Sequence, residues 1–301
     1  MTHKLSRRRF CSAVVLTAAG IAAAGCRRGV GPAPSPAPDE ASRDAALLFP
    51  QGFAWGVATS AYQIEGAVKA DGRGPSIWDT FCDRAGTIAD GSSGAVACDH
   101  YRRWESDLDV MRILGIGSYR FSIAWPRVLP EGRGPVNRRG LDFYDRLIDG
   151  LLAREISPVV TLYHWDFPQA LQDRGGWENR DSADWFTDYA MVLFTNLGDR
   201  VDRWLTINET KIIAQQGYQY GRMAPGKTDP HAAGTVIHNL NLAHGRAVTA
   251  FRAAKAKGRI GPCLQLAPCY PADQSDGAAA AAQAADVTEN TLYLDPLLKA
   301  R

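Results

Sequence analysis

The sequence lacks the patterns that mark nucleotide-binding, zinc-binding and membrane-spanning proteins. No G-x-G-x-x-G or G-x-x-x-x-G-K-[ST] run follows a strand-like segment, so nucleotide binding has no support. The cysteines match no zinc spacing, and we expect free, partly buried thiols at Cys82, Cys98, Cys263 and Cys269. The apolar run over residues 11–25 is too short and too rich in Ala and Gly to favour a spanning helix. These absences predict a globular protein without a metal or a cofactor.

The sequence has no excess of basic residues beyond position 28. The formal net charge of the whole chain is +2. The first 28 positions hold no acidic residue and six basic ones, which are Lys4, Arg7, Arg8, Arg9, Arg27 and Arg28. Without these six the net charge falls to −4, which argues against a nucleic-acid partner for the folded part.

The basic N-terminus has the pattern of an export signal. Ser6-Arg7-Arg8-Arg9-Phe10 is a twin-arginine pattern, and a weakly apolar run follows it. That run ends in Ala23-Ala24-Gly25-Cys26, which resembles the lipobox of bacterial lipoproteins and makes Cys26 the expected lipidation site. Cleavage after the small residues Ala22-Ala23-Ala24 is the alternative. Residues 1–25 therefore predict twin-arginine export to the periplasm or cell envelope, with a lipid anchor to the membrane.

Two further segments follow the signal. Residues 26–46 are rich in Pro and Ala, a composition typical of an extended linker. The globular part begins near Leu47, which gives a domain of residues 47–301. Because 46% of the chain is hydrophobic, a domain of this length can bury a substantial core.

Strand-like and helix-like segments alternate along the domain. Apolar and β-branched runs predict strands at 53–58, 119–125, 158–163, 204–209 and 259–267. Apolar residues at helical spacing predict helices at 99–114, 141–153, 184–197, 238–256 and 276–294. Alternation with connections this long favours a parallel sheet covered by helices, an α/β fold.

Polar groups follow several of the predicted strands. Gln63 follows the first, His164 and Trp165 the third, and Asn208 and Glu209 the fourth. A closed parallel barrel brings the carboxyl ends of its strands to one mouth, where barrel enzymes carry their chemistry. Glu209 can act there as a general acid. The alternative is that Glu209 is only the N-terminal carboxylate of the next helix.

Four motifs in order resemble glycoside hydrolase family 1, the β-glucosidases and their relatives. The motifs are Phe53 to Gly66 (FAWGVATSAYQIEG), Tyr119 to Arg127 (YRFSIAWPR), Tyr163 to Asp166 (YHWD) and Thr206 to Glu209 (TINE). The likeness extends from Phe49 to the end of the chain. It implies a (β/α)8 TIM barrel that is incomplete here, with about five βα units.

The resemblance also implies roles for six side chains in a retaining β-glycosidase that hydrolyses terminal β-D-glucosides or oligosaccharides in carbohydrate metabolism. It makes Glu209 the acid/base carboxylate, and it places Asn208 on the sugar 2-hydroxyl. Gln63 and His164 then bind hydroxyls on the far side of the ring, and Trp165 packs near the sugar. Arg120 supports the nucleophile and keeps it ionised. Structural alternatives stay open for four of them: a loop cap for Gln63, a core histidine for His164, a core indole for Trp165 and an ion pair for Arg120.

The second carboxylate of a retaining glycosidase has no clear counterpart. In the family it lies in a Thr-Glu-Asn-Gly motif after the seventh strand. Thr288-Glu289-Asn290-Thr291 is similar, but it follows the Ala-rich run 278–285 and is expected to lie in the helical segment after the fifth strand. We therefore expect the chain to be an N-terminal part of an enzyme, inactive alone and complemented by a C-terminal chain. The alternative is a non-catalytic remnant or a sugar-binding protein.

Overall fold

The computed structural model describes residues 49–50 and 52–299. The expected signal peptide, linker and lipidation site Cys26 all lie outside these residues. The chain divides into two units, Met1–Ala54 and Trp55–Arg301. Every helix and strand among the described residues lies in the second unit.

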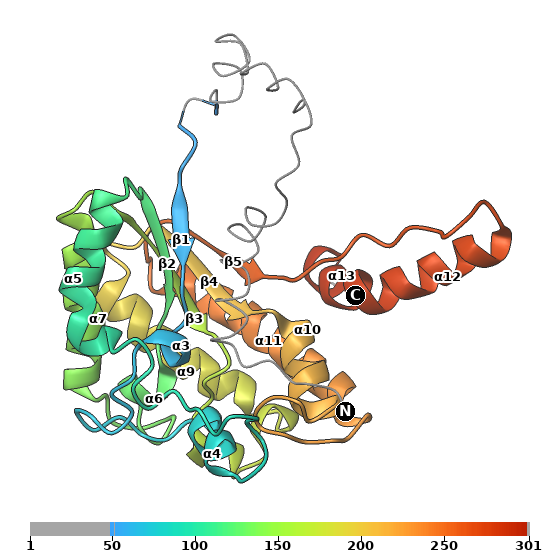
Figure 1. Ribbon diagram of the computed structural model, residues 1–301, viewed down its shortest axis with the longest axis horizontal. Helices are drawn as coiled ribbons and strands as arrows, with labels where there is room; N and C mark the ends of the chain where they lie inside the picture. The colour runs from blue at the N-terminus through green and yellow to red at the C-terminus, as the bar shows by residue number, and fades with distance from the viewer. Residues whose placement is uncertain (1–48, 51, 300–301) are drawn as a thin grey trace, which may run out of the picture. The chain divides into compact units, whose positions relative to one another are not determined.

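Five parallel strands form one sheet in the order of the sequence (Figure 1). Each strand pairs with the next one along the chain, with Gly56 opposite Ser118 at the start of the first pair. The strands are β1 (Gly56–Ala58), β2 (Ser118–Ser122), β3 (Ser157–Tyr163), β4 (Arg203–Asn208) and β5 (Arg259–Cys263). Parallel strands that neighbour one another in sequence order, joined by helices, are the arrangement of a partial (β/α)8 barrel, as the sequence predicted.

Helices connect the strands and cover the outside of the sheet (Figure 1). The long ones are α5 (His100–Ile113), α7 (Arg138–Leu152), α9 (Ser182–Leu197) and α11 (Ala232–Ala253). The short α-helices are α3 (Ala61–Ile64), α4 (Ile77–Asp83), α6 (Trp125–Val128), α8 (Gln169–Gln172), α10 (Thr210–Ile212), α12 (Asp276–Asp286) and α13 (Leu292–Leu298). The 3₁₀ turn η1 (Gly176–Glu178) and the π-helical turns η2 (Ile213–Gln219) and η3 (Val287–Thr291) complete the set.

An aromatic cluster joins the ends of β2 and β3 to the helix that covers them. Trp125 stacks on Tyr189 of α9, with ring centroids 4.7 Å apart. The Tyr189 hydroxyl bonds to the carbonyls of Ile123 and Leu162 at 3.1 and 2.9 Å. Both rings are fully buried, and burial of their apolar surface holds α9 against the carboxyl ends of β2 and β3, where the polar residues follow.

The predicted elements differ from the observed ones at the start of α11, which begins at Ala232 instead of residue 238, and at several strand ends. The second strand was expected to continue to residue 125, but β2 ends at Ser122 and Trp125 begins α6. Pro126 causes this, because proline is favoured in the first turn of a helix and cannot donate to a sheet ladder. The first strand starts at Gly56 instead of residue 53, and β5 ends at Cys263 instead of residue 267.

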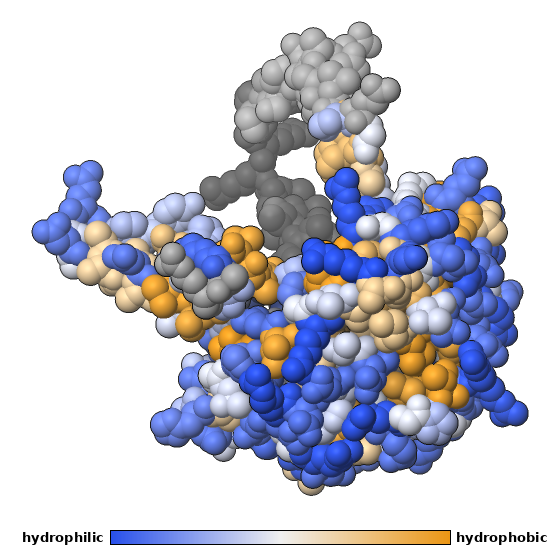
Figure 2. Space-filling model, turned by 180° about the vertical axis from the view of Figure 1, so that it is seen from behind, coloured by the Kyte–Doolittle hydropathy of each residue, from blue (hydrophilic) through white to orange (hydrophobic). Residues whose placement is uncertain are grey.

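Hydrophobic surface remains exposed at both ends of the sheet. All three residues of β1 are exposed, and Val57 keeps 38% of its surface accessible. The helical segment α12–α13 extends away from the strands, and α12 buries none of its side chains. Figure 2 shows hydrophobic surface on this segment, which includes Val287, Leu292 and Leu298.

The apolar run over residues 11–25 lies outside the described residues, whereas the four cysteines lie within them. The described cysteines Cys82, Cys98, Cys263 and Cys269 are free thiols, and three are half-buried while Cys98 is exposed, unlike the expectation for that residue. Within the described part of the chain, no helix combines the length and the apolar character needed to cross a bilayer.

Candidate active site

Asn208 is the centre of the polar cluster at the carboxyl ends of the strands. It is the last residue of β4, with only 1% of its surface exposed. Its side-chain oxygen accepts a hydrogen bond from Arg120 at 2.5 Å, and its backbone carbonyl accepts one from the Trp165 indole at 2.8 Å. Its amide nitrogen lies 3.3 Å from Nε2 of His164. Side chains from β2, from the turn after β3 and from β4 therefore meet at one point.

Arg120 has a geometry that fits a supporting role. It lies on β2, and its Nε donates to the Thr161 hydroxyl on β3 at 2.9 Å while its terminal nitrogen donates to Asn208 on β4. The Arg120 side chain on β2 thus links β2 to β3 and β4, because the guanidinium carries several donors in a rigid planar group. No carboxylate of the described residues forms an ion pair with Arg120, so its charge acts on the cluster itself.

His164 is held as a neutral imidazole. Burial, followed by the nearby charge of Arg120, lowers the pKa of His164 to about 3. Because the Asn208 amide can only donate, Nε2 of His164 accepts, and the ring proton sits on Nδ1. Nδ1 is buried and has no hydrogen-bond partner among the described residues. A neutral ring with a fixed tautomer suits recognition of a hydroxyl, and it does not fit a fully satisfied core histidine.

Two residues of the site adopt left-handed backbone conformations. Trp165 has φ 79° and Glu209 has φ 53°. Such angles are rare for bulky side chains, cost about 1–3 kcal/mol each and concentrate at functional sites. The bond from the Trp165 indole to the Asn208 carbonyl holds the first of them in place.

Glu209 follows β4 and directly precedes α10. Its backbone nitrogen donates to the carbonyl of Cys263 at 2.7 Å, which fixes the residue against the end of β5. Although Glu209 stands at the cap position of α10, its side chain makes no capping hydrogen bond. Glu209 thus stands at the N-terminus of a helix, as the structural alternative expected, but its half-buried carboxylate is not engaged in a capping bond. Thr210 is buried and begins α10.

Gln63 lies at the same edge of the sheet but apart from the Asn208 cluster. The sequence suggested a loop here, whereas residues 61–64 form the short helix α3. The Ser122 side chain at the end of β2 accepts a bond from the Ala61 nitrogen at 2.7 Å and so anchors this helix. Gln63 is exposed, and no hydrogen bond of the described residues joins its side chain to the cluster.

An apolar pocket lies beside Trp165. Its walls include Trp78, Trp165, Ile213 and Met223. Such a wall can contact the apolar face of a sugar or an aglycone, and Trp165 adds to it an indole that also binds the cluster. No group of His, Cys, Asp and Glu among the described residues is arranged to hold a metal ion.

Glu289 has a structural environment that differs from that of Glu209. It lies in η3, inside the helical segment expected after the fifth strand. Its carboxylate pairs with Lys211 of α10 at 2.7 Å. Its neighbour Asn290 bonds both the nitrogen and the carbonyl of Ala267, at 2.9 and 2.8 Å. These contacts fasten η3 to the loop after β5 and to α10.

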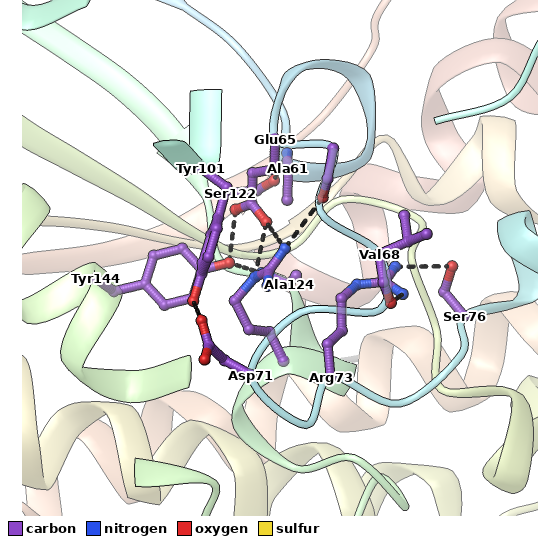
Figure 3. A network of polar contacts seen from close by, with 12 residues as sticks. Ala61, Glu65, Val68, Asp71, Arg73, Ser76, Tyr101, Ser122, Ala124 and Tyr144 are labelled. Atoms are coloured by element: carbon purple, nitrogen blue, oxygen red, sulfur yellow. Dashed lines mark hydrogen bonds and ion pairs between the residues drawn. The ribbon is translucent and has the colours of Figure 1, made fainter. Parts of the chain in front are cut away.

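A buried ion pair under the site was not assigned a role from the sequence. Arg127 and Glu65 are almost fully buried and lie 2.9 Å apart. The Tyr144 hydroxyl donates to Glu65 at 2.6 Å (Figure 3). Arg127 also packs 4.1 Å from the ring centroid of Tyr101. Both charged residues belong to quoted motifs, but only the fold reveals that they face one another.

Comparison with known proteins agrees with this arrangement. The profile of glycosyl hydrolase family 1 matches residues 46–301. The chain is 51% identical over 255 residues to β-glucosidase A of Acetivibrio thermocellus, covering 85% of this chain and 57% of that protein. It is 53% identical over 228 residues to β-glucosidase A of Thermotoga maritima, covering 76% and 51%.

The solved structures show the same relationship. The β-glucosidase from Thermotoga maritima in complex with deoxynojirimycin superimposes with a TM-score of 0.81 at 50% identity, covering 83% of this chain and 57% of that one. The chain thus spans about half the length of the relatives it matches. Because the profile covers most of the sequence, the chain belongs to glycosyl hydrolase family 1.

Proposed function

We propose that this chain supplies the acid/base side of a retaining β-glucosidase active site, acting on terminal β-D-glucosides. The observation that carries the proposal is Glu209, whose carboxylate makes no capping bond and which stands next to the Asn208 cluster at the carboxyl edge of the sheet. The relatives named above are β-glucosidases, which supports the choice of substrate.

Each residue of the cluster has a chemical task in this proposal. Glu209 protonates the departing glycosidic oxygen and later removes a proton from the attacking water. The Asn208 amide keeps one N–H after its contact with His164 and donates it to the sugar 2-hydroxyl. Gln63 and the neutral His164 bind further hydroxyls, and Trp165 packs against the ring.

The reaction also needs a nucleophile about 5–5.5 Å from the acid/base carboxylate. We propose that it is provided by βα units other than the five described, in a complementing C-terminal chain. Glu289 is a poor candidate because it is paired with Lys211 in a helical turn. Arg120, which has no carboxylate partner among the described ion pairs, is available to stabilise an ionised nucleophile.

Substitution of Glu209 tests the proposal in the complemented protein. Glu209→Ala should slow hydrolysis of glucosides with poor leaving groups by about 10²–10⁴-fold more than those with good ones, because only the former need the acid. Added azide should partly restore turnover by replacing the activated water. The matched control is Glu131→Ala, an exposed carboxylate in a turn. Equal losses on both substrate types, with no effect of azide, would exclude Glu209 as the acid/base.

A non-catalytic sugar-binding protein is the second candidate. It is favoured by the five strands described, which place one half-buried carboxylate, Glu209, beside the Asn208 cluster. Calorimetry with deoxynojirimycin, the ligand of the Thermotoga maritima structure, distinguishes the two functions. Binding without any turnover after complementation would favour the sugar-binding protein.

We further propose that the chain is exported by the twin-arginine route and anchored through Cys26. The support is the Ser6 to Phe10 pattern and the Gly-Cys end of the apolar run. Fractionation of cells that carry Arg7→Lys/Arg8→Lys or Cys26→Ala tests both points. Normal export of the double variant would contradict the route, and membrane retention of Cys26→Ala would contradict the anchor.

A further inference from the structure

Asp166 is a buried carboxyl group that the proposed function does not use. It follows Trp165 in the turn after β3, with 1% of its surface exposed. Neither of its two side-chain oxygens has a hydrogen-bond partner among the described residues. An ionised carboxylate in such a position carries a large desolvation cost, so its environment must supply a proton or a partner.

The side chain of Asp166 borders a small cavity between the turn and the segment after β1. The other walls include Ala61, Tyr62, Glu65, Val68 and Arg73. The space is large enough to admit a water molecule, and the wall offers several polar groups to bind one. Figure 3 shows Glu65 and Arg73 of this wall together with the contacts that they make.

The charges around the cavity are already matched without Asp166. Glu65 pairs with Arg127 at 2.9 Å, and Arg73 pairs with Asp79 at 2.8 Å. An ionised Asp166 would therefore add one uncompensated negative charge to a buried cluster. Burial, and then the charge of Glu65, raises the pKa of Asp166 to about 8, while Arg73 opposes the shift.

We propose that Asp166 is a neutral carboxylic acid that donates a hydrogen bond to ordered water in this cavity and thereby positions the turn that carries His164 and Trp165. Main-chain bonds already hold the far side of the turn, from Ile77 to the Phe167 carbonyl at 2.8 Å and from Gln169 to the Pro75 carbonyl at 2.9 Å. Through the bound water, Asp166 links the other side of the turn to the segment after β1. It acts as a positioning residue, because it reaches the site only through its neighbours in the turn.

The groups that act electrostatically on Asp166 come from several elements. They are Glu65 from the segment after β1, Arg73 and Asp79 near α4, Tyr163 from β3 and Tyr189 from α9. Tyr62 also lines the cavity. A carboxyl whose pKa is higher in the folded chain than in the unfolded one binds an extra proton on folding. Its stabilising effect is complete below about pH 4 and is lost as the pH rises to about 8. Asp166→Asn keeps a neutral donor at every pH and removes this loss.

Three measurements on the full chain test the proposal independently of glycosidase activity. Carboxyl ¹³C NMR should show Asp166 titrating far above 3.8, its value as an ordinary carboxyl. Urea unfolding should show Asp166→Asn gaining stability over the natural chain as the pH rises from 4 to 8. Asp166→Leu, which displaces the water, should shift the indole N–H signal of Trp165, while Asp166→Asn should leave it in place.

The control is Asp142→Asn on the exposed face of α7, which should not change the pH dependence of stability. Titration of Asp166 near its ordinary value would overturn its assignment as a neutral acid. A loss of stability in Asp166→Asn that is equal at all pH values would do the same. An unchanged Trp165 signal in Asp166→Leu would overturn the positioning role. Because these readouts need no turnover, failure of the glycosidase proposal would leave them interpretable.

Discussion

Asn208 shows how much of the site depends on a single side chain at the end of a strand. Its amide and its backbone carbonyl contact Arg120, His164 and Trp165, which lie 43 to 88 positions away in the sequence. None of these three can reposition without breaking a bond to Asn208. The cluster is therefore set by the register of β2, β3 and β4 together with the turn that follows β3.

The buried pair Arg127–Glu65 gives a prediction at the same scale. Arg127→Met leaves the Glu65 carboxylate buried with Tyr144 as its remaining side-chain partner, so we expect a loss of about 3–5 kcal/mol in unfolding free energy. Glu65→Leu/Arg127→Met together should recover much of that loss, because no uncompensated charge remains. Urea unfolding followed by tryptophan fluorescence measures both.

The control is Arg133→Met, whose partner Asp188 lies on the surface, with exposed fractions of 45% and 58% for the two side chains. Removing a surface pair costs about 1 kcal/mol or less. If the double variant were as unstable as Arg127→Met alone, the loss would come from packing against Tyr101 and not from the uncompensated charge.

At the scale of elements, periodicity predicted most of the fold. All five predicted strands and all five predicted helical segments are present, because the spacing of apolar residues along the chain distinguishes helix from strand. The helix predicted at 99–114 is observed as α5, which ends at Ile113, and Gly115 just beyond it adopts φ 70°. The strand ends at residues 53–55 and 123–125 were wrong, since sheet pairing and Pro126 decide them and not hydrophobicity.

The site was predicted only in part, because the sequence does not reveal every tertiary contact. The motifs indicated Asn208, His164 and Trp165 as neighbours, because polar residues that follow parallel strands converge at one edge. The unpartnered oxygens of Asp166 were not predictable, because they depend on what the segment after β1 brings to the cavity. The lack of hydrogen-bond partners for the Asp166 carboxyl results from tertiary packing, and no residue pattern near Asp166 indicates it.

Two glycines within helices give a prediction about α7 and α11. A Cβ at Gly140 of α7 would lie 2.0 Å from the carbonyl oxygen of Arg127, so Gly140→Ala should force the two elements apart and lower stability. A Cβ at Gly245 of α11 meets nothing within 4 Å. Gly245→Ala should therefore stabilise the chain by about 0.5–1 kcal/mol, through helix propensity alone.

Thermal unfolding of the two variants compares them directly. Opposite signs are expected, with the melting temperature lower for Gly140→Ala and higher for Gly245→Ala. Destabilisation by both would mean that α11 has a close neighbour at Gly245 in the protein, and equal stabilisation by both would contradict the tight contact between α7 and Arg127.

At the scale of the whole molecule, the five described strands leave both ends of the sheet unpaired. β1 pairs only with β2, and β5 pairs only with β4. Unpaired edges favour aggregation, and α12, which buries none of its side chains, adds hydrophobic surface. A barrel closes when further strands cover such edges, and the relatives that superimpose on this chain are nearly twice its matched length.

We therefore predict that this chain alone has no glycosidase activity and low stability, and that a second chain restores both. The second chain is the part of the Thermotoga maritima β-glucosidase that the matched region does not cover. We expect its strands to cover the edges of β1 and β5 and its nucleophile to face Glu209, so an aryl β-glucoside should be hydrolysed only by the mixture. The same second chain with its nucleophile replaced by Ala should raise the melting temperature without turnover, which separates closure of the barrel from the chemistry. A cooperative melt with full turnover by this chain alone would refute the prediction, and it would return Glu289 as the candidate nucleophile despite its pairing with Lys211.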